Sequence, residues 1–493
     1  MNTNLSILLA RLVALAALIA TAILPAAHAA PPLQVVAIDS NLHYKTSPNE
    51  VIPRTIEYTL SGATVHLKEK LADGTTVVTN GSTKVRVLLP VGYATGANYP
   101  VVYLLHGFNS DYQGWSNMNH ENDPSDTLEA NTRNANVVFV MPDGDASGGF
   151  YSNWYSSPDG LMRDWETYHI EQLIPWVEAN FKVKKTRAGR AISGLSMGGF
   201  GSSSYASRHP DLFAGVFSIS GAVNNIPLAL AGLLEGAPPS VKDMNPMLKI
   251  NISDIWGPFG QQEVLYRGSN PMDLIDNLRP LTVWLRTGLG LPELGNGRPS
   301  AREVLDKVLE AGVGAMNVAY DTDLRLHAVP HKFLVDPQAT HTGYHFMQSF
   351  KLALPVMQQA FAANVGTPAS FDYRTIVPAF SVFDWKFTAA RDVSEFLYLS
   401  AVSRDGLKLK GSGTVVVTTP PVYQPGSHHW VLAPGQPGIN VWPDRPKADA
   451  NGRLHFNVQL GNSHTLQQYT SAQRDAEDAA PDYWKNATIK ISN

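Results

Sequence analysis

The stretch Ala188-Gly189-Arg190-Ala191-Ile192-Ser193-Gly194-Leu195-Ser196-Met197-Gly198 decides the fold that we expect. Residues 188–193 predict a buried strand, and the small residues after Gly198 predict a helix. A serine between such a strand and helix, with a glycine two residues away on each side, is the pattern of a nucleophile elbow, because glycine lets the strand and the helix approach closely. The five letters alone are common, so the flanking elements carry the argument. We therefore expect an α/β-hydrolase fold with Ser196 as the nucleophile.

Short apolar runs on both sides of the elbow predict the rest of a mostly parallel central sheet. Runs at 101–105, 137–141, 214–220 and 280–286 are bounded by Gly, Pro, Asp or other polar residues. Such continuous runs are typical of strands that are buried on both faces. Helical spacing of apolar residues over 166–181 predicts a covering helix. Strands that alternate with helices indicate a parallel sheet with helices on both faces.

The composition changes near the end of the chain. After about residue 366, Thr, Val, Pro and Gly dominate, and helical periodicity largely disappears. A chain of 493 residues also exceeds what one hydrophobic core usually organises. We expect a boundary near 365–372, with a catalytic domain over 31–366 and a β-rich accessory domain over 370–493.

Four aromatic residues of the accessory region, Trp385, Tyr423, Trp430 and Trp442, suggest a stacking surface for a carbohydrate or another polymer. The other interpretation is that they belong to the core, where aromatic residues of a β-domain usually lie. The core is the favoured interpretation, and a binding surface is the alternative.

The first thirty residues differ from the rest of the chain. Arg11 precedes the apolar run 12–24, and the small residues of Ala27-His28-Ala29 follow it. This order predicts a signal peptide over 1–30, because the apolar run is short for a membrane span and a small-x-small site follows at once. An uncleaved N-terminal anchor is the alternative. We expect a secreted or periplasmic protein whose mature form has no membrane span.

Composition excludes several other kinds of chemistry. The chain has no cysteine, which removes disulfides, thiolate metal sites and a cysteine nucleophile. Charged residues make up 16% and the formal net charge is only -4, which argues against a nucleic-acid partner. His and carboxylate residues show no metal-ligand spacing, so we expect neither a catalytic metal nor another cofactor.

A serine nucleophile needs a histidine to accept its proton and a carboxylate to orient that histidine. In this fold the chain order is serine, acid, histidine. His341 follows the apolar run 333–335 and precedes a helix that would close the domain, so it is the favoured base. His345 and His331 are the alternatives.

The acid should follow the strand at 280–286, which leaves Glu293, Glu303 and Asp306 as candidates. Spacing alone does not decide among them. Glu303 and Asp306, next to Arg302 and Lys307, are also typical of a solvated helix face.

Backbone N–H groups of Phe108 and Met197 are the candidate oxyanion donors. His106-Gly107-Phe108 ends the strand at 101–105, where this fold presents its second donor, and Met197 follows the nucleophile. His106 precedes the serine, and we interpret it as structural rather than as the base.

Several segments occur together in the order of one known family. They are residues 104–107, 111–115, 150–155, 165–168, 194–199, 255–258 and 340–341. Over roughly 85–362 the chain resembles the putative-esterase family of α/β-hydrolases, which includes esterase D and the secreted mycolyltransferases. The resemblance implies Ser196 as nucleophile, His341 as base and Asp306 as acid, with Glu303 in reserve.

The chain also departs from part of that family. The mycolyltransferases have an aspartate and an arginine where this chain has His106 and Asn109, which suggests that their sugar-acceptor site is absent and favours water as the acceptor. We expect a carboxylic-ester hydrolase that forms an acyl-enzyme on Ser196 and acts on a small-molecule, lipid or polymer ester. Acyl transfer to a sugar, glycerol or an alcohol is the main alternative, and a non-catalytic surface-binding protein is the other.

Overall fold

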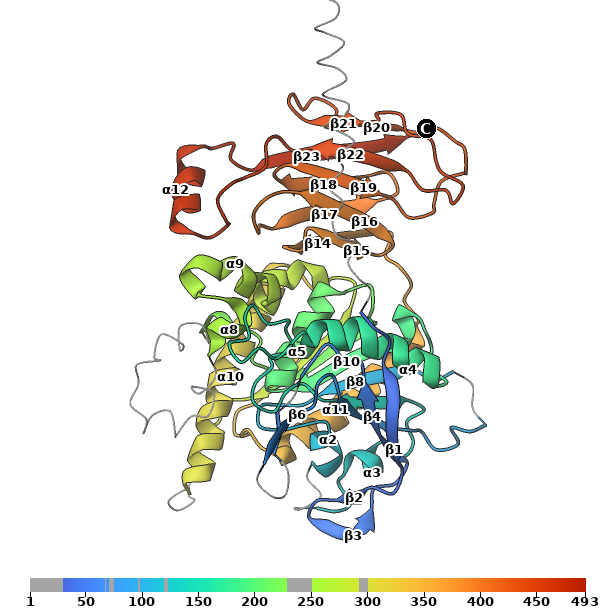
Figure 1. Cartoon of the computed structure of the whole chain (residues 1–493), viewed down its shortest axis with the longest axis vertical. Helices are drawn as coiled ribbons and strands as arrows, with labels where there is room; N and C mark the ends of the chain where they lie inside the picture. Colours follow the sequence, from blue (N-terminus) through green and yellow to red (C-terminus); the bar gives the residue numbers. More distant parts are fainter. Residues whose placement is uncertain are drawn as a thin grey trace, which may run out of the picture.

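The computed structural model describes residues 30–66, 68–70, 75–95, 98–118, 123–227, 251–291 and 300–493. These residues form a larger α/β unit followed by a smaller, mainly β C-terminal unit that lies against one end of it (Figure 1). The expected signal peptide lies almost entirely outside the described residues. In the part of the chain that the structure describes, no helix combines the length and the apolar character that crossing a membrane requires.

The larger unit is built on a nine-stranded sheet. In spatial order its strands are β1 (Gln34–Asp39), β4 (Thr55–Ser61), β7 (Thr83–Leu88), β9 (Val138–Pro142), β8 (Val101–Leu105), β10 (Arg190–Leu195), β11 (Gly215–Ile219), β12 (Thr282–Gly288) and β13 (His331–Asp336). Strands β9 to β13 in this order pair in parallel, whereas β1, β4 and β7 form an antiparallel edge. All residues of β8, β9, β10 and β11 are buried, as continuous apolar runs predict. The expected α/β class is confirmed.

Helices cover both faces of this sheet. They include α4 (Ile174–Asn180), α5 (Met197–Arg208), α8 (Ile252–Trp256), α9 (Phe259–Ser269), α10 (Ala301–Leu326), α11 (Gly343–Ala363) and the short α2 (Gly114–Asn117) and α3 (Leu128–Asn131). Alternate residues of β8 enter two different cores, because successive side chains of a strand point to opposite faces. Tyr103 packs in the core that contains Phe200 of α5, and Leu104 packs in the core that contains Phe350 of α11.

The helix predicted over 166–181 has two parts. A π-helix, η1 (Thr167–Leu173), runs directly into α4. Pro175 stands at the start of α4 and lacks the N–H that a continuous α-helix would donate to the carbonyl of Glu171. The sequence periodicity detected the helix but not this change in winding.

The C-terminal unit consists of two five-stranded antiparallel sheets around one shared core. One sheet is β14 (Ser370–Thr375), β17 (Leu397–Ser403), β18 (Gly406–Gly411), β23 (Lys485–Ser492) and β20 (Trp430–Leu432); the other is β15 (Ala379–Val382), β16 (Trp385–Ala390), β19 (Thr414–Thr418), β22 (His455–Gln459) and β21 (Asn440–Trp442). Figure 1 shows β14 and β15 next to the larger unit and β20 and β21 at the opposite end. The C-terminal region is therefore β-rich, as expected, and it forms its own pair of antiparallel sheets.

The four aromatic residues of this unit divide between core and surface. Trp385 and Tyr423 are only 4% and 5% exposed, whereas Trp430 and Trp442, on the edge strands β20 and β21, are 39% and 72% exposed. A stacking surface made of all four is therefore wrong, because two of them pack in the shared core. Trp430 and Trp442 remain available at the surface.

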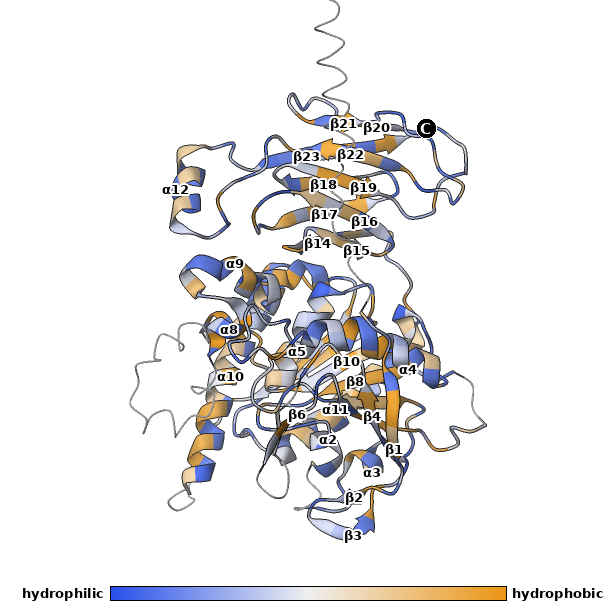
Figure 2. Cartoon of the chain, in the orientation of Figure 1, coloured by the Kyte–Doolittle hydropathy of each residue, from blue (hydrophilic) through white to orange (hydrophobic). Residues whose placement is uncertain are grey.

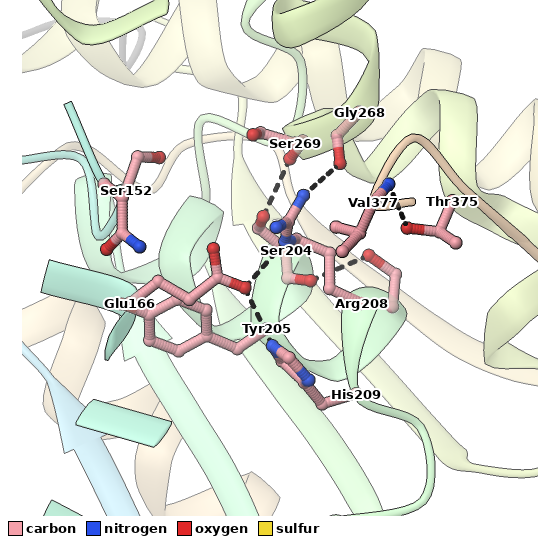
Figure 3. Close-up of polar contacts among 12 residues, drawn as sticks. Ser152, Glu166, Ser204, Tyr205, Arg208, His209, Gly268, Ser269, Thr375 and Val377 are labelled. Atoms are coloured by element: carbon pink, nitrogen blue, oxygen red, sulfur yellow. Dashed lines mark hydrogen bonds and ion pairs between the residues drawn. The ribbon is translucent and has the colours of Figure 1, made fainter. Parts of the chain in front are cut away.

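The two units meet at the end of α5, the helix that follows Ser196. Glu166 accepts hydrogen bonds from Arg208 Nε and His209 Nε2, each at 2.7 Å (Figure 3). Burial alone would raise the pKa of Glu166, but the charges and hydrogen bonds of Arg208 and His209 lower it to about 2. The hydroxyl of Tyr373, in β14, donates to the carbonyl of Arg208 at 2.7 Å. The nucleophile helix is thus attached to both units at its far end.

Candidate active site

Ser196 occupies a strained turn between β10 and α5. Its φ of 55° and ψ of -119° lie in a region that side-chain-bearing residues rarely adopt. The strand and helix approach so closely that a Cβ on Gly194 would lie 2.0 Å from the carbonyl oxygen of Gly198. A Cβ on Gly198 would lie 2.3 Å from the carbonyl oxygen of Leu105. Both glycines of the elbow are therefore required by contact distances, and Ser196 begins the helix as the elbow pattern predicts.

The loop after β8 is held rigidly beside the elbow. His106 hydrogen-bonds through Nδ1 to the carbonyl of Gly107 at 2.8 Å, and its Nε2 accepts from the N–H of Gly144 at 2.8 Å. The hydroxyl of Tyr151 donates to the carbonyl of His106, also at 2.8 Å. Both ring nitrogens of His106 are therefore occupied, which fits a structural role. This loop places Phe108 at the wall of the cavities that contain Ser196.

Two cavities meet at Ser196 and His341. The loop-side cavity, of about 290 Å³, is bordered by His106, Ser110, Trp115, Met118, Thr342 and Phe346 among others. The helix-side cavity, of about 310 Å³, is bordered by Phe150, Met197, Ala222, Leu305, Asp306, Leu309 and Val313 among others. Ser196, His341, Phe108 and Arg302 border both. The structure therefore brings the predicted nucleophile, base and oxyanion loop to one place.

The carboxylate beside His341 belongs to Glu310. Nδ1 of His341 lies 2.6 Å from Oε2 of Glu310, and this carboxylate is fully buried on α10. With Nδ1–H donating to Glu310, Nε2 of His341 is the nitrogen left to accept a proton. No hydrogen bond to Nε2 comes from the described part of the chain.

Three further groups hold the other oxygen of Glu310. Oε1 accepts hydrogen bonds from the N–H of Gly288 at 2.5 Å, from Ser220 Oγ at 2.6 Å and from Thr287 Oγ1 at 3.2 Å. Burial alone would raise the pKa of Glu310, but hydrogen bonds from His341 and Ser220 and the charge of His341 outweigh it, so the net pKa is lowered. Glu310 is therefore kept ionised and oriented toward His341.

Asp306, the acid that the sequence favoured, does not contact the ring of His341. Its Oδ2 accepts a hydrogen bond from Arg302 Nε at 3.1 Å, and its main-chain carbonyl accepts from the N–H of His341 at 3.1 Å. Asp306 and Glu310 are one helical turn apart on the same face of α10, so sequence spacing does not separate them. Figure 2 shows hydrophobic and hydrophilic residues alternating along this helix.

The other candidates are placed elsewhere. Glu303 is exposed and closes a capping box with Ser300 at the start of α10, which lowers its pKa through hydrogen bonds with Ser300. Glu293 lies outside the described residues. His331 uses Nδ1 with the carbonyl of Val329 and Nε2 with Asp321, each at 2.8 Å.

His345 contacts Ser220, one of the donors to Glu310. It is 3% exposed, and its Nε2 lies 3.2 Å from Ser220 Oγ, the group that donates to Glu310. Burial lowers the pKa of His345 to about 4, so its ring is neutral near pH 7. It borders neither cavity.

Sequence reasoning missed Glu310. One signal existed: Glu310 shares the inward stripe of α10 with Gly314, Asn317 and Tyr320, and all of these residues are buried. Asp306 lies on the same stripe one turn earlier, so this signal adds Glu310 to the candidate acids without separating it from Asp306.

A sequence model of the family described as putative esterase matches residues 76–361. The chain belongs to the putative esterase family. Esterase Rv1288 of Mycobacterium tuberculosis is 31% identical over 252 residues, which cover 50% of this chain and 50% of that protein. Diacylglycerol acyltransferase/mycolyltransferase Ag85A of Mycobacterium leprae is 28% identical over 284 residues, covering 55% of this chain and 78% of the relative.

The family resemblance seen in the sequence is thus confirmed. Among solved structures, Mycobacterium tuberculosis MPT51 (FbpC1) is similar to 60% of this chain and 99% of its own, with a TM-score of 0.42 and 18% identity. The chain spans about half the length of the esterases with which it shares 31% identity.

Proposed function

We propose that the chain hydrolyses carboxylic esters through an acyl-enzyme on Ser196. In the first step Nε2 of His341 takes the proton of Ser196 Oγ as that oxygen bonds to the ester carbonyl carbon. The N–H groups of Phe108 and Met197 hold the resulting oxyanion. His341 then returns the proton to the alkoxide, and the C–O bond breaks to release the alcohol.

Water completes the cycle by the same route. His341 takes a proton from water as the water oxygen attacks the acyl carbon, and the proton returns to Ser196 Oγ when the acid leaves. Glu310 keeps its negative charge throughout and stabilises the protonated ring of His341. The observation that carries this proposal is the 2.6 Å contact between His341 and the fully buried Glu310. His341 also borders both cavities that Ser196 borders.

The two cavities suggest where the parts of the ester lie. The helix-side cavity is lined mainly by apolar residues, including Leu305, Leu309 and Val313, and would take the acyl group. The loop-side cavity adds polar groups such as Ser110 and Thr342 and would take the alcohol.

Ser196→Ala tests the proposal. We expect the turnover of p-nitrophenyl esters to fall by about 10⁴-fold or more, because loss of a triad nucleophile removes the covalent route. A fluorophosphonate should label the wild-type protein at Ser196 and fail to label the variant. Ser125→Ala, at an exposed serine, is the matched control and should keep both properties. An unlabelled wild-type protein that hydrolyses no ester of a chain-length series would contradict the proposal.

Acyl transfer is the second candidate, because a relative at 28% identity is named an acyltransferase. It uses the same acyl-enzyme, but the hydroxyl of a sugar, glycerol or another alcohol attacks the acyl carbon in place of water. Product analysis with excess glycerol or sugar distinguishes them: we expect mainly free acid, and a dominant new ester would favour transfer.

We also propose export, supported by Arg11, the apolar run 12–24 and the small residues of Ala27-His28-Ala29. Determining the N-terminus of the mature protein tests this. A new N-terminus near residue 30 in the exported fraction is expected, and an intact N-terminus on membranes would favour the anchor instead.

Trp442 and Trp430 support a polymer contact by the C-terminal unit. Trp442, the last residue of β21, is 72% exposed, and Figure 1 shows β21 at the end of the unit far from the larger one. Trp442→Ala should reduce retention on an insoluble polysaccharide or polyester without changing turnover of a soluble ester. Val422→Ala, at another exposed apolar residue of the same unit, is the control, and equal retention of all three proteins would contradict the contact.

A further inference from the structure

Arg302 presents unused hydrogen-bond donors at the cavities that contain Ser196. Its side chain is 76% exposed and borders both cavities. The guanidinium carries five N–H groups, and its Nε donates to Asp306 Oδ2 at 3.1 Å. Within the part of the chain that the structure describes, Nη1 and Nη2 donate to no other group. The four N–H groups on these two nitrogens are therefore open to a molecule that enters either cavity.

Asp306 holds the guanidinium in place from the buried side. The side chain of Asp306 is only 8% exposed, and Nε of Arg302 lies 3.0 Å from its Oδ1. The main-chain carbonyl of Asp306 accepts from the N–H of His341 at 3.1 Å, which links Arg302 to the segment that carries the base. Because Asp306 occupies Nε, the outer edge formed by Nη1 and Nη2 stays free. That edge matches the two oxygens of a carboxylate.

Asn109 offers a second open donor beside Arg302. It is exposed and borders the helix-side cavity. Its main-chain N–H donates to the carbonyl of Ala146 at 2.9 Å, whereas its side-chain amide makes no hydrogen bond with the described residues. Asn109 does not border the loop-side cavity, so the two side chains share the helix-side cavity alone.

The charges at the cavities favour an anionic group. Apart from histidines, the charged side chains among the described residues that border the two cavities are Arg302 and Asp306. Their side-chain exposures of 76% and 8% mean that an entering molecule meets the guanidinium rather than the carboxylate. An ammonium group would be repelled there, whereas a carboxylate would gain charge-assisted hydrogen bonds.

We propose that Arg302, together with Asn109, binds a carboxylate on the acyl group of the substrate. The preferred substrates are then half-esters of dicarboxylic acids. Their acyl chain lies along the apolar wall formed by Leu305, Leu309 and Val313, and their free carboxylate reaches the exposed guanidinium. The inference rests on the proposed esterase function and adds the chemical class of the acyl group. Arg302 determines specificity and takes no part in the proton transfers.

Matched ester pairs test the inference. We would compare p-nitrophenyl hydrogen adipate with the ester in which a carboxamide replaces the free carboxylate, and repeat the comparison with suberate. The two groups have the same shape and differ in charge. The wild-type protein should prefer the acid by about 5- to 20-fold in kcat/KM for at least one chain length, between the effects of an exposed ion pair and of a charge-assisted hydrogen bond. About 0.5 M NaCl should reduce this preference several-fold, because salt screens an exposed charge.

Three variants locate the contact. Arg302→Gln can still donate to Asp306 but lacks the charge, so the acid-to-amide ratio should fall close to one. Asn109→Ala should lower the ratio about two- to threefold, as expected for one neutral donor. Lys307→Gln removes the same charge from the same helix at a residue that borders neither cavity, and it should keep the wild-type ratio. Each ratio compares two esters in one protein, so a general change in activity cancels.

Butanoates of 4-hydroxybenzoate and 4-hydroxybenzamide place the same two groups on the alcohol side of the ester. Arg302→Gln should leave the ratio of this pair unchanged. A ratio that Arg302→Gln lowers only in this pair would place the carboxylate on the alcohol and overturn its assignment to the acyl group.

The remaining outcomes separate the inference from the proposed function. A wild-type ratio near one, a ratio that survives Arg302→Gln, or an equal loss in Lys307→Gln removes the acyl contact but leaves the labelled Ser196 and the esterase function intact. Absence of fluorophosphonate labelling and of all ester hydrolysis would remove the proposed function itself.

Discussion

Each unit of this protein contains a buried cluster of a glutamate, a histidine and a serine. In the larger unit Glu310 pairs with His341 at 2.6 Å and accepts from Ser220 at 2.6 Å. In the C-terminal unit Glu395 lies 2.7 Å from Nδ1 of His464, and Ser412 Oγ donates to Glu395 at 2.6 Å. The compositions and distances are nearly the same.

The clusters differ at the second nitrogen of the histidine. Nε2 of His464 lies 3.0 Å from the carbonyl of Tyr483, and the ring stacks on that tyrosine with centroids 4.0 Å apart. The ring of His341 borders two cavities instead, together with Ser196. A buried acid and histidine are therefore not enough to form a catalytic site. The histidine must also keep one nitrogen open toward a cavity that holds a nucleophile.

Glu310→Gln gives the largest expected effect. The glutamine can no longer stabilise a protonated His341, so kcat should fall by about 10³- to 10⁴-fold, as happens when triad acids are removed. Steady-state kinetics on p-nitrophenyl esters measure it. Glu395→Gln is the matched control and should keep kcat within about twofold. If both variants lost activity equally, the two clusters would not differ in the way described.

The C-terminal cluster should matter for stability instead. Glu395 and Arg391 are 1% and 2% exposed at their side chains and lie 3.6 Å apart. Removing one partner of a buried ion pair leaves the other charge uncompensated, at a cost of about 3–5 kcal/mol. Urea unfolding of Glu395→Gln, with Asp482→Asn as an exposed control, should show this loss. An unchanged midpoint would contradict it.

Acid should act on the cluster of the larger unit through His345. The pKa of its ring is about 4 in the folded protein because of burial, against about 6.5 when unfolded. Between these values the unfolded chain binds a proton that the folded one does not, so stability falls as pH decreases from 6.5 to 4. The slope from this residue is at most about 1.4 kcal/mol per pH unit. His345→Gln should flatten the stability profile in that window by this amount, and unchanged slopes would contradict the low pKa.

The two serines that donate to the glutamates give the smallest effects. Ser220→Ala removes a donor to Oε1 of Glu310, and the loss of orientation should lower kcat by about three- to tenfold. Ser412→Ala should leave kcat unchanged and lower the free energy of unfolding by about 1–2 kcal/mol. Kinetics and urea unfolding of both variants would show whether each serine serves catalysis or stability. A loss of kcat in Ser412→Ala with an unchanged kcat in Ser220→Ala would contradict the comparison.

Much of the fold could be predicted because its signals are local. The buried strand β8 covers the apolar run at 101–105, and β13 and α11 lie around His341 as the sequence indicated. The π-helical winding of η1 was not predictable from periodicity, because a seven-residue segment holds too few apolar positions to distinguish i→i+5 from i→i+4 winding. The division of the four accessory aromatic residues between core and surface was not predictable either. Alternation along a strand indicates its two faces but not which face another sheet covers.

By itself the sequence determined the elbow at Ser196, because it depends on neighbours in the chain: an apolar strand, two glycines and a helix of small residues. It also indicated His341 through order and position. Only the tertiary structure showed that Glu310, and not Asp306 on the same face of α10, contacts the ring of His341. The N–H of Gly288 and the hydroxyl of Ser220, which is 90 residues from Glu310 in the chain, donate to the carboxylate of Glu310. Arg302 donates to the carboxylate of Asp306 instead. Contacts between residues so far apart leave no local pattern.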